Sequence, residues 1–146
     1  MSTQAQPDSR QVIADDLRAA LAGKLDANKV EVATKKILAT DTGYSANGSV
    51  MSAIFYLKFQ VNVSGGKQFN GKAGGLSTPG GGALFGTVYT DDINALYANT
   101  QTFEWQGTTG YLSIVFFDGN GSSLGNFQSG AVSTVVGIGG GKGSWE

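Results

Sequence analysis

Residues 54–63, IFYLKFQVNV, decide the fold class of this chain. Apolar side chains stand at every second position from Phe55 to Val63, and from Lys58 onward the residues between them are polar. A period of two is typical of a β-strand with one face in a core and the other in solvent. The residues that follow, 64–67 (SGGK), form a turn sequence that predicts a return strand through Phe69.

The same signals continue to the end of the chain. Further strands are predicted at residues 73–78, 83–89, 101–106, 110–117, 123–128 and 130–138, with a tight turn at residues 118–121 (DGNG). Residues 90–97 interrupt them, because a capping Asp is followed there by apolar residues three and four apart. We therefore expect an all-β region, a barrel or a sandwich, with one short helix.

A short internal repeat lies within this region. The sequence GGLST at residues 74–78 recurs as GAVST at residues 130–134, and each copy follows a strand-like run that contains a phenylalanine, Phe69 or Phe127. Two related halves that close on one another explain the repeat, because each half alone exposes an apolar face that its partner covers. On this interpretation Gly74 and Gly130 are expected where two backbones approach closely or where φ is positive.

Charge divides the chain near residue 43. Residues 1–43 carry twelve of the twenty-one charged side chains, whereas residues 44–146 are rich in glycine and in uncharged polar residues. The first part predicts a helix capped at Asp8 or Ser9, with an apolar stripe that recurs every four residues; the stripe is Ile13, Leu17, Leu21 and Leu25. Residues 28–39 fit a strand or a helical face. We expect an N-terminal charged helical arm, 1–43, and a glycine-rich barrel domain, 44–146.

Charge and hydropathy indicate which classes of partner and which locations to expect. The net charge is −1, and the largest basic cluster is the pair Lys35-Lys36, so no nucleic-acid partner is expected. The longest apolar stretch is far shorter than the roughly 18 residues of a membrane-spanning helix. Residues 1–4 (MSTQ) do not begin a signal sequence, so the expected location is the cytoplasm or, for a mature fragment, outside the cell.

Catalytic and metal-binding residue types are scarce. The chain has no His and no Cys, which excludes a Ser-His-Asp triad, a Cys nucleophile and a His-ligated zinc site. The glycine-rich strings at residues 80–86 and 137–144 lack the spacing and the following helix of a phosphate loop. No enzyme activity, cofactor or metal site is predicted.

The remaining candidates are one acid and two indoles. Glu104 stands between Phe103 and Trp105, where the simplest interpretation is the solvent-facing residue of a strand. Trp105 and Trp145 are candidates for ligand or membrane contact, although core packing explains most aromatic residues of this region. Without histidine, a switch between about pH 5 and pH 7 would need a carboxylate of raised pKa, with Glu104 the best candidate, so little response is expected above about pH 4.

Several ordered runs resemble the virulence-associated protein (Vap) family of Rhodococcus. The runs are residues 69–76 (FNGKAGGL), 79–87 (PGGGALFGT), 111–118 (YLSIVFFD), 130–133 (GAVS) and 139–145 (GGGKGSW). The match covers residues 44–145, and the charged N-terminal segment departs from the family pattern. The resemblance implies a compact antiparallel eight-stranded barrel of two Greek-key units with one short helix. It also implies secreted proteins that act on the phagocytic compartment of a host cell.

Three functional hypotheses follow. The first is a non-enzymatic virulence-type protein that acts on a host phagosomal membrane lipid or a host protein. The second is a ligand-binding barrel, with carbohydrate as a candidate ligand, in which exposed aromatics and amide side chains bind. The third is a structural module that docks to another protein through its N-terminal helix. Oligomeric state is not predicted.

Overall fold

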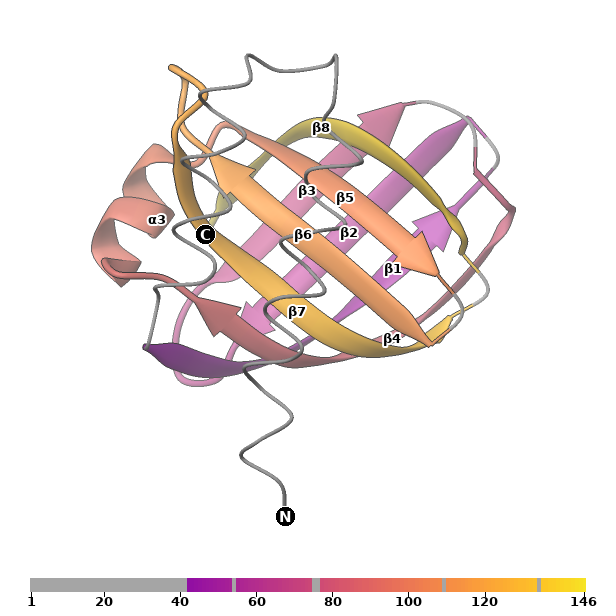
Figure 1. The fold of residues 1–146 in the computed structure, drawn as a ribbon, viewed down its shortest axis with the longest axis horizontal. Helices are drawn as coiled ribbons and strands as arrows, with labels where there is room; N and C mark the ends of the chain where they lie inside the picture. Colours follow the sequence, from indigo (N-terminus) through magenta and orange to yellow (C-terminus); the bar gives the residue numbers. More distant parts are fainter. Residues whose placement is uncertain (1–41, 54, 75–76, 109, 134) are drawn as a thin grey trace.

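The computed structural model describes residues 42–53, 55–74, 77–108, 110–133 and 135–146, with only the backbone described at 131–133. Within these residues, eight antiparallel strands close into a barrel, and a short helix lies at one end of it (Figure 1). The elements are β1 (Gly43–Ser52), β2 (Tyr56–Val63), β3 (Gln68–Gly74), β4 (Gly80–Tyr89), α3 (Ile93–Asn99), β5 (Thr102–Thr108), β6 (Tyr111–Phe117), β7 (Ser123–Ser133) and β8 (Gly137–Trp145). The prediction of an all-β barrel with one short helix is confirmed.

The order of the strands divides the barrel into two units of the same topology. Around the wall the order is β1-β2-β3-β8-β5-β6-β7-β4. Within the first four strands the neighbours run β4-β1-β2-β3, and within the last four they run β8-β5-β6-β7, which is the Greek-key order in both cases. The units join where β3 pairs with β8 and where β4 pairs with β7.

The internal repeat occupies equivalent places in these two units. Gly74 ends β3 and Gly130 lies in β7, and these are the third strands of the first and second units. Phe69 and Phe127 belong to the same two strands, and both side chains are fully buried. Both copies therefore begin on the third strand of their unit, Gly74 at the end of β3 and Gly130 within β7.

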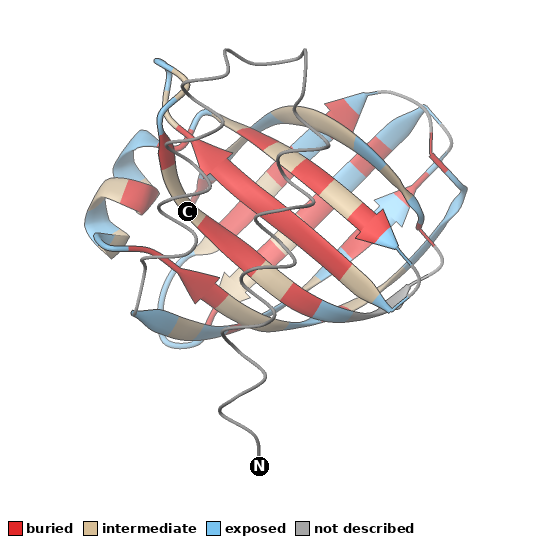
Figure 2. Cartoon of the chain, viewed as in Figure 1, coloured by how far each residue is buried: buried red, intermediate tan, exposed pale blue. Residues whose placement is uncertain are grey.

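The stretch that set the fold class forms β2. Its buried positions alternate with exposed or half-buried ones, and Leu57, Phe59, Val61 and Val63 point into the barrel. Figure 2 shows the same alternation of buried and less buried residues along most strands. The turn at residues 64–67 returns the chain into β3, as predicted.

Aromatic rings fill the barrel beside β8, a strand whose inward positions are mostly glycine. The inward positions of β8 before Trp145 are Gly137, Gly139, Gly141 and Gly143. A Cβ at Gly143 would lie 2.5 Å from Cζ of Phe69, and one at Gly139 would lie 3.1 Å from Nε1 of Trp105. The rings of Phe69 and Phe103, 5.4 Å apart in an edge-to-face arrangement, use the room that glycine leaves. Large side chains on β3 and β5 therefore require glycine on β8, which lies between them.

Helix α3 covers one end of the barrel. The N–H groups of Asn94 and Ala95 donate to Oδ1 of Asp92, both at 3.0 Å, so Asp92 is the N-cap. Leu96 is fully buried in the core, and the ring of Tyr97 lies 5.2 Å from that of Trp145. The helix predicted at residues 90–97 is confirmed, and it starts at Ile93, directly after the cap Asp92.

The C-terminal strands differ from the prediction. Residues 123–128 and 130–138 were expected to be two strands, but β7 runs continuously from Ser123 to Ser133, and β8 begins only at Gly137. The sequence GIGGGKGSW holds only one β-branched residue, Ile138, and one aromatic residue, Trp145, among five glycines, so its pattern favours turns. Pairing with β3 and β5 on both sides nevertheless holds it extended. The predicted N-terminal helix lies outside the described residues. Of the predicted arm, residues 1–43, the structure describes only Thr42 and Gly43.

The expectation for Gly74 and Gly130 is wrong. A Cβ at Gly74 would meet no atom within 4 Å, one at Gly130 would meet only the Phe85 carbonyl oxygen at 4.0 Å, and neither residue has a positive φ. Both glycines face outward, where the barrel leaves space. Close approach occurs instead at inward glycines such as Gly141, where a Cβ would collide with the backbone carbonyl oxygen of Lys72.

Substituting Gly141 with Val is expected to destabilise the barrel by about 1–3 kcal/mol or more, because the new side chain collides with neighbouring backbone that cannot turn away. Gly74→Val is the matched control, and its effect is expected to stay within about 0.5 kcal/mol. Urea unfolding followed by the fluorescence of the buried Trp105 and Trp145 measures both. Equal stability of the two variants would contradict the proposed filling of the barrel.

Candidate functional site

The two indoles proposed for ligand or membrane contact lie in the core. Trp105 is 2% exposed and Trp145 is 6% exposed. The ring of Trp145 packs 5.4 Å from that of Phe69 and 5.3 Å from that of Phe116, and Trp105 packs 5.3 Å from Phe59. In this structure neither indole offers a face to a ligand or a membrane.

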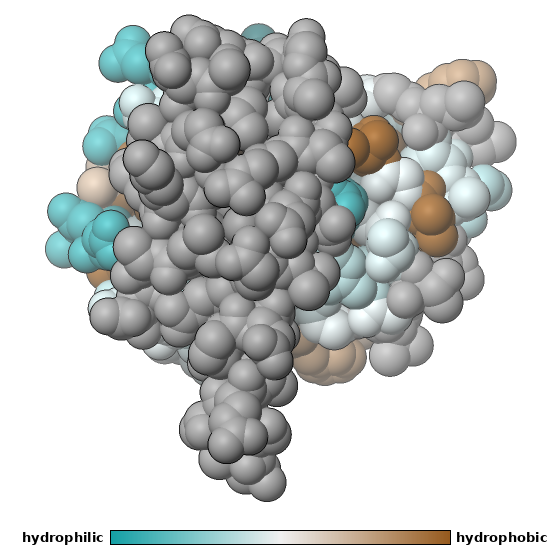
Figure 3. Space-filling model, in the orientation of Figure 1, coloured by the Kyte–Doolittle hydropathy of each residue, from teal (hydrophilic) through white to brown (hydrophobic). Residues whose placement is uncertain are grey.

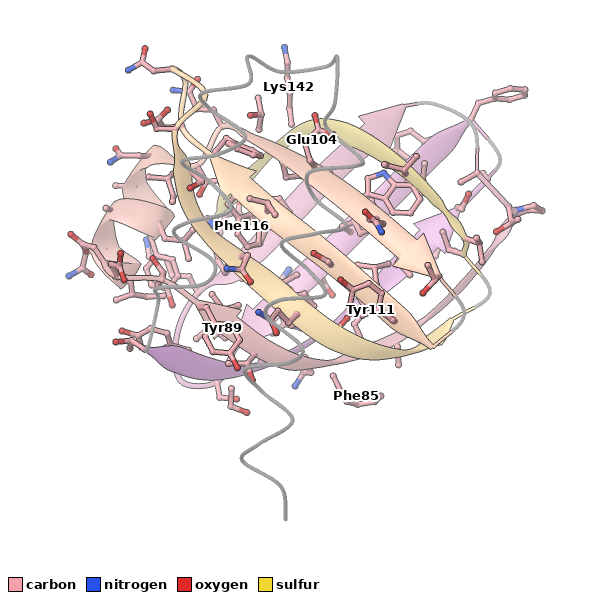
Figure 4. All side chains as sticks on the ribbon, in the orientation of Figure 1. Phe85, Tyr89, Glu104, Tyr111, Phe116 and Lys142 are labelled. Carbon is pink, nitrogen blue, oxygen red and sulfur yellow. The ribbon has the colours of Figure 1, made fainter. Side chains whose placement is uncertain are left out.

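Glu104 points outward from β5, half-buried on the wall of the barrel. It stands opposite Val115 of β6 and Gly140 of β8. A Cβ at Gly140 would lie 2.6 Å from Oε1 of Glu104, so the carboxylate lies over the space that this glycine leaves. Figure 4 shows Glu104 on the wall and not inside the barrel.

Two of the other four acids of the barrel, Asp92 and Asp118, have structural roles. Asp92 caps α3. Asp118 accepts hydrogen bonds at 2.9 Å from the N–H groups of Asn120 and Ser122, which holds the β6–β7 turn. No group of three or more acids, Cys or His that could hold a metal ion occurs in the residues that the structure describes. These acids therefore offer no evident catalytic pair.

The sheet register assembles a row of lysines that the sequence does not show. Lys58 of β2 pairs with Lys72 of β3, and Lys72 pairs with Lys142 of β8. All three side chains are exposed, and Figure 4 shows Lys142 extending away from the barrel. Directly opposite residues on neighbouring strands have Cβ atoms about 5 Å apart, so these ammonium groups concentrate positive charge on one part of the wall. Three of the four lysines of residues 44–146 belong to this row.

Exposed apolar side chains continue the lysine row towards the end of the barrel away from α3. Met51 of β1 stands directly opposite Lys58 and is 65% exposed. Tyr56, two residues before Lys58, is 47% exposed, and Phe55 in the preceding turn is 72% exposed. We call the six residues Met51, Phe55, Tyr56, Lys58, Lys72 and Lys142 the basic–apolar patch.

The two ends of the barrel differ in charge and polarity. Asp91, Asp92, Asp118 and Glu146 all lie at the end that carries α3, because they occupy its cap, the β6–β7 turn and the chain terminus. The opposite end carries the exposed Phe55, Val136 and Ile138. Figure 3 shows apolar surface emerging towards that end on the side in view. These four acids therefore lie away from the apolar end of the basic–apolar patch, whereas Glu104 lies on the wall opposite Gly140 of β8.

The lysine row costs stability, since like charges stand directly opposite one another on neighbouring strands. We expect Lys72→Gln to stabilise the protein by about 0.2–1 kcal/mol at low ionic strength. The gain should shrink at high salt, where screening weakens the repulsion. Thermal unfolding at low and high salt measures it, with Lys67→Gln in the β2–β3 turn as the control outside the row. A gain that does not depend on salt would argue against repulsion within the row.

The solved structures that match this chain include two proteins from the intracellular pathogen Rhodococcus equi. The virulence-associated protein VapD is 41% identical, with a TM-score of 0.71, over 73% of this chain and 99% of that one. The virulence-associated protein VapB is 48% identical, with a TM-score of 0.68, over 72% of this chain and 96% of that one. Comparison with curated protein sequences gives no match.

A family model described as Rhodococcus equi virulence-associated protein matches residues 3–146. The match is longer than the resemblance at residues 44–145, so the expectation that the N-terminal segment departs from the family pattern is wrong. The family model spans every strand of the closed barrel and all of the motifs that carry the resemblance. This chain belongs to the Rhodococcus equi virulence-associated protein family.

Proposed function

We propose that this protein is secreted and acts without catalysis at the membrane of a host phagosome, where its basic–apolar patch contacts anionic lipid headgroups. The observation that carries the proposal is the lysine row beside the exposed side chains of Met51, Phe55 and Tyr56. Family membership supports the choice of a host compartment, because the solved relatives VapD and VapB come from an intracellular pathogen.

The chemistry of the patch suits a membrane surface. A lysine near an anionic membrane contributes about 1 kcal/mol of attraction, so the row of Lys58, Lys72 and Lys142 would supply roughly 3 kcal/mol. Insertion of apolar side chains at the headgroup boundary adds to this attraction. Phe55 lies in a turn at the barrel end and is 72% exposed, which suits shallow insertion. No helix in the described part of the chain is long and apolar enough to cross a membrane.

Action without catalysis is supported by the roles of the acids. Asp92 and Asp118 accept backbone hydrogen bonds that hold a helix cap and a turn. Glu104 lies on the barrel wall, with Val115 and Gly140 as its cross-strand neighbours, and the register brings no second carboxylate opposite it. A two-carboxylate mechanism needs a facing pair about 5–10 Å apart.

The ligand-binding alternative has less support. It relied on exposed aromatics, but Trp105 and Trp145 are buried, and fully buried side chains such as Phe59 and Phe69 occupy the interior. Of the exposed aromatic residues, Phe55 and Tyr56 belong to the basic–apolar patch, and Phe85 lies outside it. The same surface therefore serves the lipid hypothesis better than a sugar platform.

Co-sedimentation with liposomes tests the membrane proposal. We expect binding to vesicles that contain an anionic lipid, little binding to purely zwitterionic vesicles, and release by high salt. Lys72→Glu should weaken binding by at least about fivefold, because it replaces an attraction of about 1 kcal/mol with a repulsion. Phe55→Ser should weaken binding at high salt as well, since its contribution is apolar.

The matched control is Lys67→Glu, which makes the same change of net charge in the β2–β3 turn outside the row. An equal loss of binding in Lys67→Glu and Lys72→Glu would mean that net charge alone drives binding. Unchanged binding in both would remove the basis for the proposal.

Binding should change little between pH 7 and about pH 5, because lysine stays charged and the chain has no histidine to titrate there. Near about pH 4 the acids begin to gain protons, the protein becomes more positive, and binding to anionic vesicles should rise gradually. Co-sedimentation across this range measures it, with Glu104→Gln in parallel. A sharp gain near pH 6 that Glu104→Gln abolishes would instead make Glu104 a functional residue.

A further inference from the structure

Strand β6 is buried on both faces, unlike the other strands of the barrel. Its inward residues Leu112, Ile114 and Phe116 belong to the core cluster. Its outward residues alternate with these, and yet Val115 is 1% exposed and Phe117 is 2% exposed. Neither belongs to the core cluster. Figure 2 shows β6 buried along nearly its whole length. Something outside the barrel wall must cover this strand.

The covered area extends sideways from β6. Val115 pairs with Asn126 of β7, and Asn126 pairs with Tyr89 of β4. Tyr89 is 3% exposed and Asn126 is 2% exposed, although both point outward. We call Tyr89, Val115, Phe117 and Asn126 the covered face. Among the described elements, α3 lies at the end of the barrel and not over this wall (Figure 1).

The equivalent strand of the other unit shows the contrast. β2 holds the same place in the first Greek key that β6 holds in the second. The outward residues of β2 after Tyr56 are Lys58, Gln60 and Asn62, which are exposed or half-buried. Those of β6 include Val115 and Phe117. β2 and β6 hold the same place in the topology, but the outer face of β2 is polar and that of β6 is apolar. The apolar outer face is therefore specific to the β6 side of the barrel.

The N-terminal segment departs from the barrel beside the covered face. Gly43, the first residue of β1, pairs with Tyr89. The carbonyl oxygen of Thr42 accepts a hydrogen bond of 3.3 Å from the N–H of Thr90. The 41 residues before Thr42 therefore start within one strand spacing of the covered face.

The sequence of residues 1–41 contains an apolar stripe that could cover an apolar surface. Ile13, Leu17, Leu21 and Leu25 recur every four residues, a spacing that would put them on one side of a helix. A helix over residues 9–25 would be about 25 Å long, and the wall from β4 to β5 spans about 14 Å. The chain from 26 to 41 is long enough to position such a helix at any point of that wall. A single helix of this kind is marginal in water unless its apolar side is buried.

We infer that residues 9–25 pack their apolar stripe on the covered face formed by Tyr89, Val115, Phe117 and Asn126. β6 and β2 lie on opposite sides of the eight-stranded ring, so the arm leaves the basic–apolar patch free. The segment that we predicted to dock to another protein has its partner in its own barrel.

Thiol reactivity tests this inference in the full chain, which contains no cysteine of its own. Val115→Cys is nearly isosteric and places one thiol on the covered face. We expect this thiol to react with a maleimide at least about tenfold faster after the double substitution Leu17→Asp and Leu21→Asp, because the arm then loses its apolar contact. The control is Ile138→Cys, an outward position of β8 that is 41% exposed, which should react at the same rate with and without the aspartates.

Two outcomes would overturn the inference. If the aspartates leave the reactivity of the Val115→Cys thiol unchanged, another occupant covers the face. If that thiol becomes reactive on simple dilution of the protein, the occupant is a second copy of the chain.

A second measurement does not depend on disrupting the arm. A spin label on Arg18→Cys, which lies off the stripe, should broaden the amide signals of Val115 and Asn126 far more than those of Lys58 and Gln60. Broadening that persists when labelled protein is mixed with a separate isotope-enriched copy would show an intermolecular contact. Equal broadening on both sides of the barrel would contradict docking of the arm.

Discussion

The barrel depends on the contact between aromatic rings and inward glycines along β8. Phe69 on β3 and Phe103 on β5 lie on either side of this strand, and their rings are 5.4 Å apart. A Cβ at Gly143 would lie 2.5 Å from the ring of Phe69, and one at Gly141 would collide with the backbone of Lys72. Protein interiors are packed so closely that even one added methyl group is felt. A side chain at these inward positions would separate β3 from β5, and the two Greek keys join there. Closure of the barrel is thus a consequence of complementary residue sizes on three neighbouring strands.

The two Greek-key units share a topology and differ in what they present to the outside. The first unit turns Lys58 and Lys72 outward, and the second turns Val115 and Phe117 outward. An antiparallel sheet whose outer face is wet alternates apolar and polar residues, as β2 does. β6 departs from that rule because its outer face is covered. One scaffold therefore separates a surface suited to an external partner from a surface suited to the chain's own arm.

Membership of the virulence-associated protein family does not by itself supply a mechanism, because function resides in sites and not in folds. Asp92 and Asp118 accept backbone hydrogen bonds that stabilise a helix and a turn. On the membrane proposal, an external partner meets distributed charge and exposed apolar surface. Such a surface acts through the sum of weak attractions, which suits a lipid headgroup layer better than a single small molecule. The patch and the arm are consistent with a protein that works by contact.

The sequence by itself determined the fold class, the short helix and the pairing of β2 with β3, because these depend on local periodicity and turn residues. It also located two equivalent segments, around Gly74 and Gly130, although it misjudged why glycine occurs there. It missed β8, since a glycine-rich strand has no periodicity of its own and is held extended only by its neighbours. It placed Trp105 and Trp145 among candidate contacts, because alternation alone does not say which face of a strand is inside.

Only the tertiary structure aligned Lys58, Lys72 and Lys142, which are 14 and 70 residues apart along the chain. Such a row depends on strand register, and register is set by long-range pairing and not by any property of the lysines themselves.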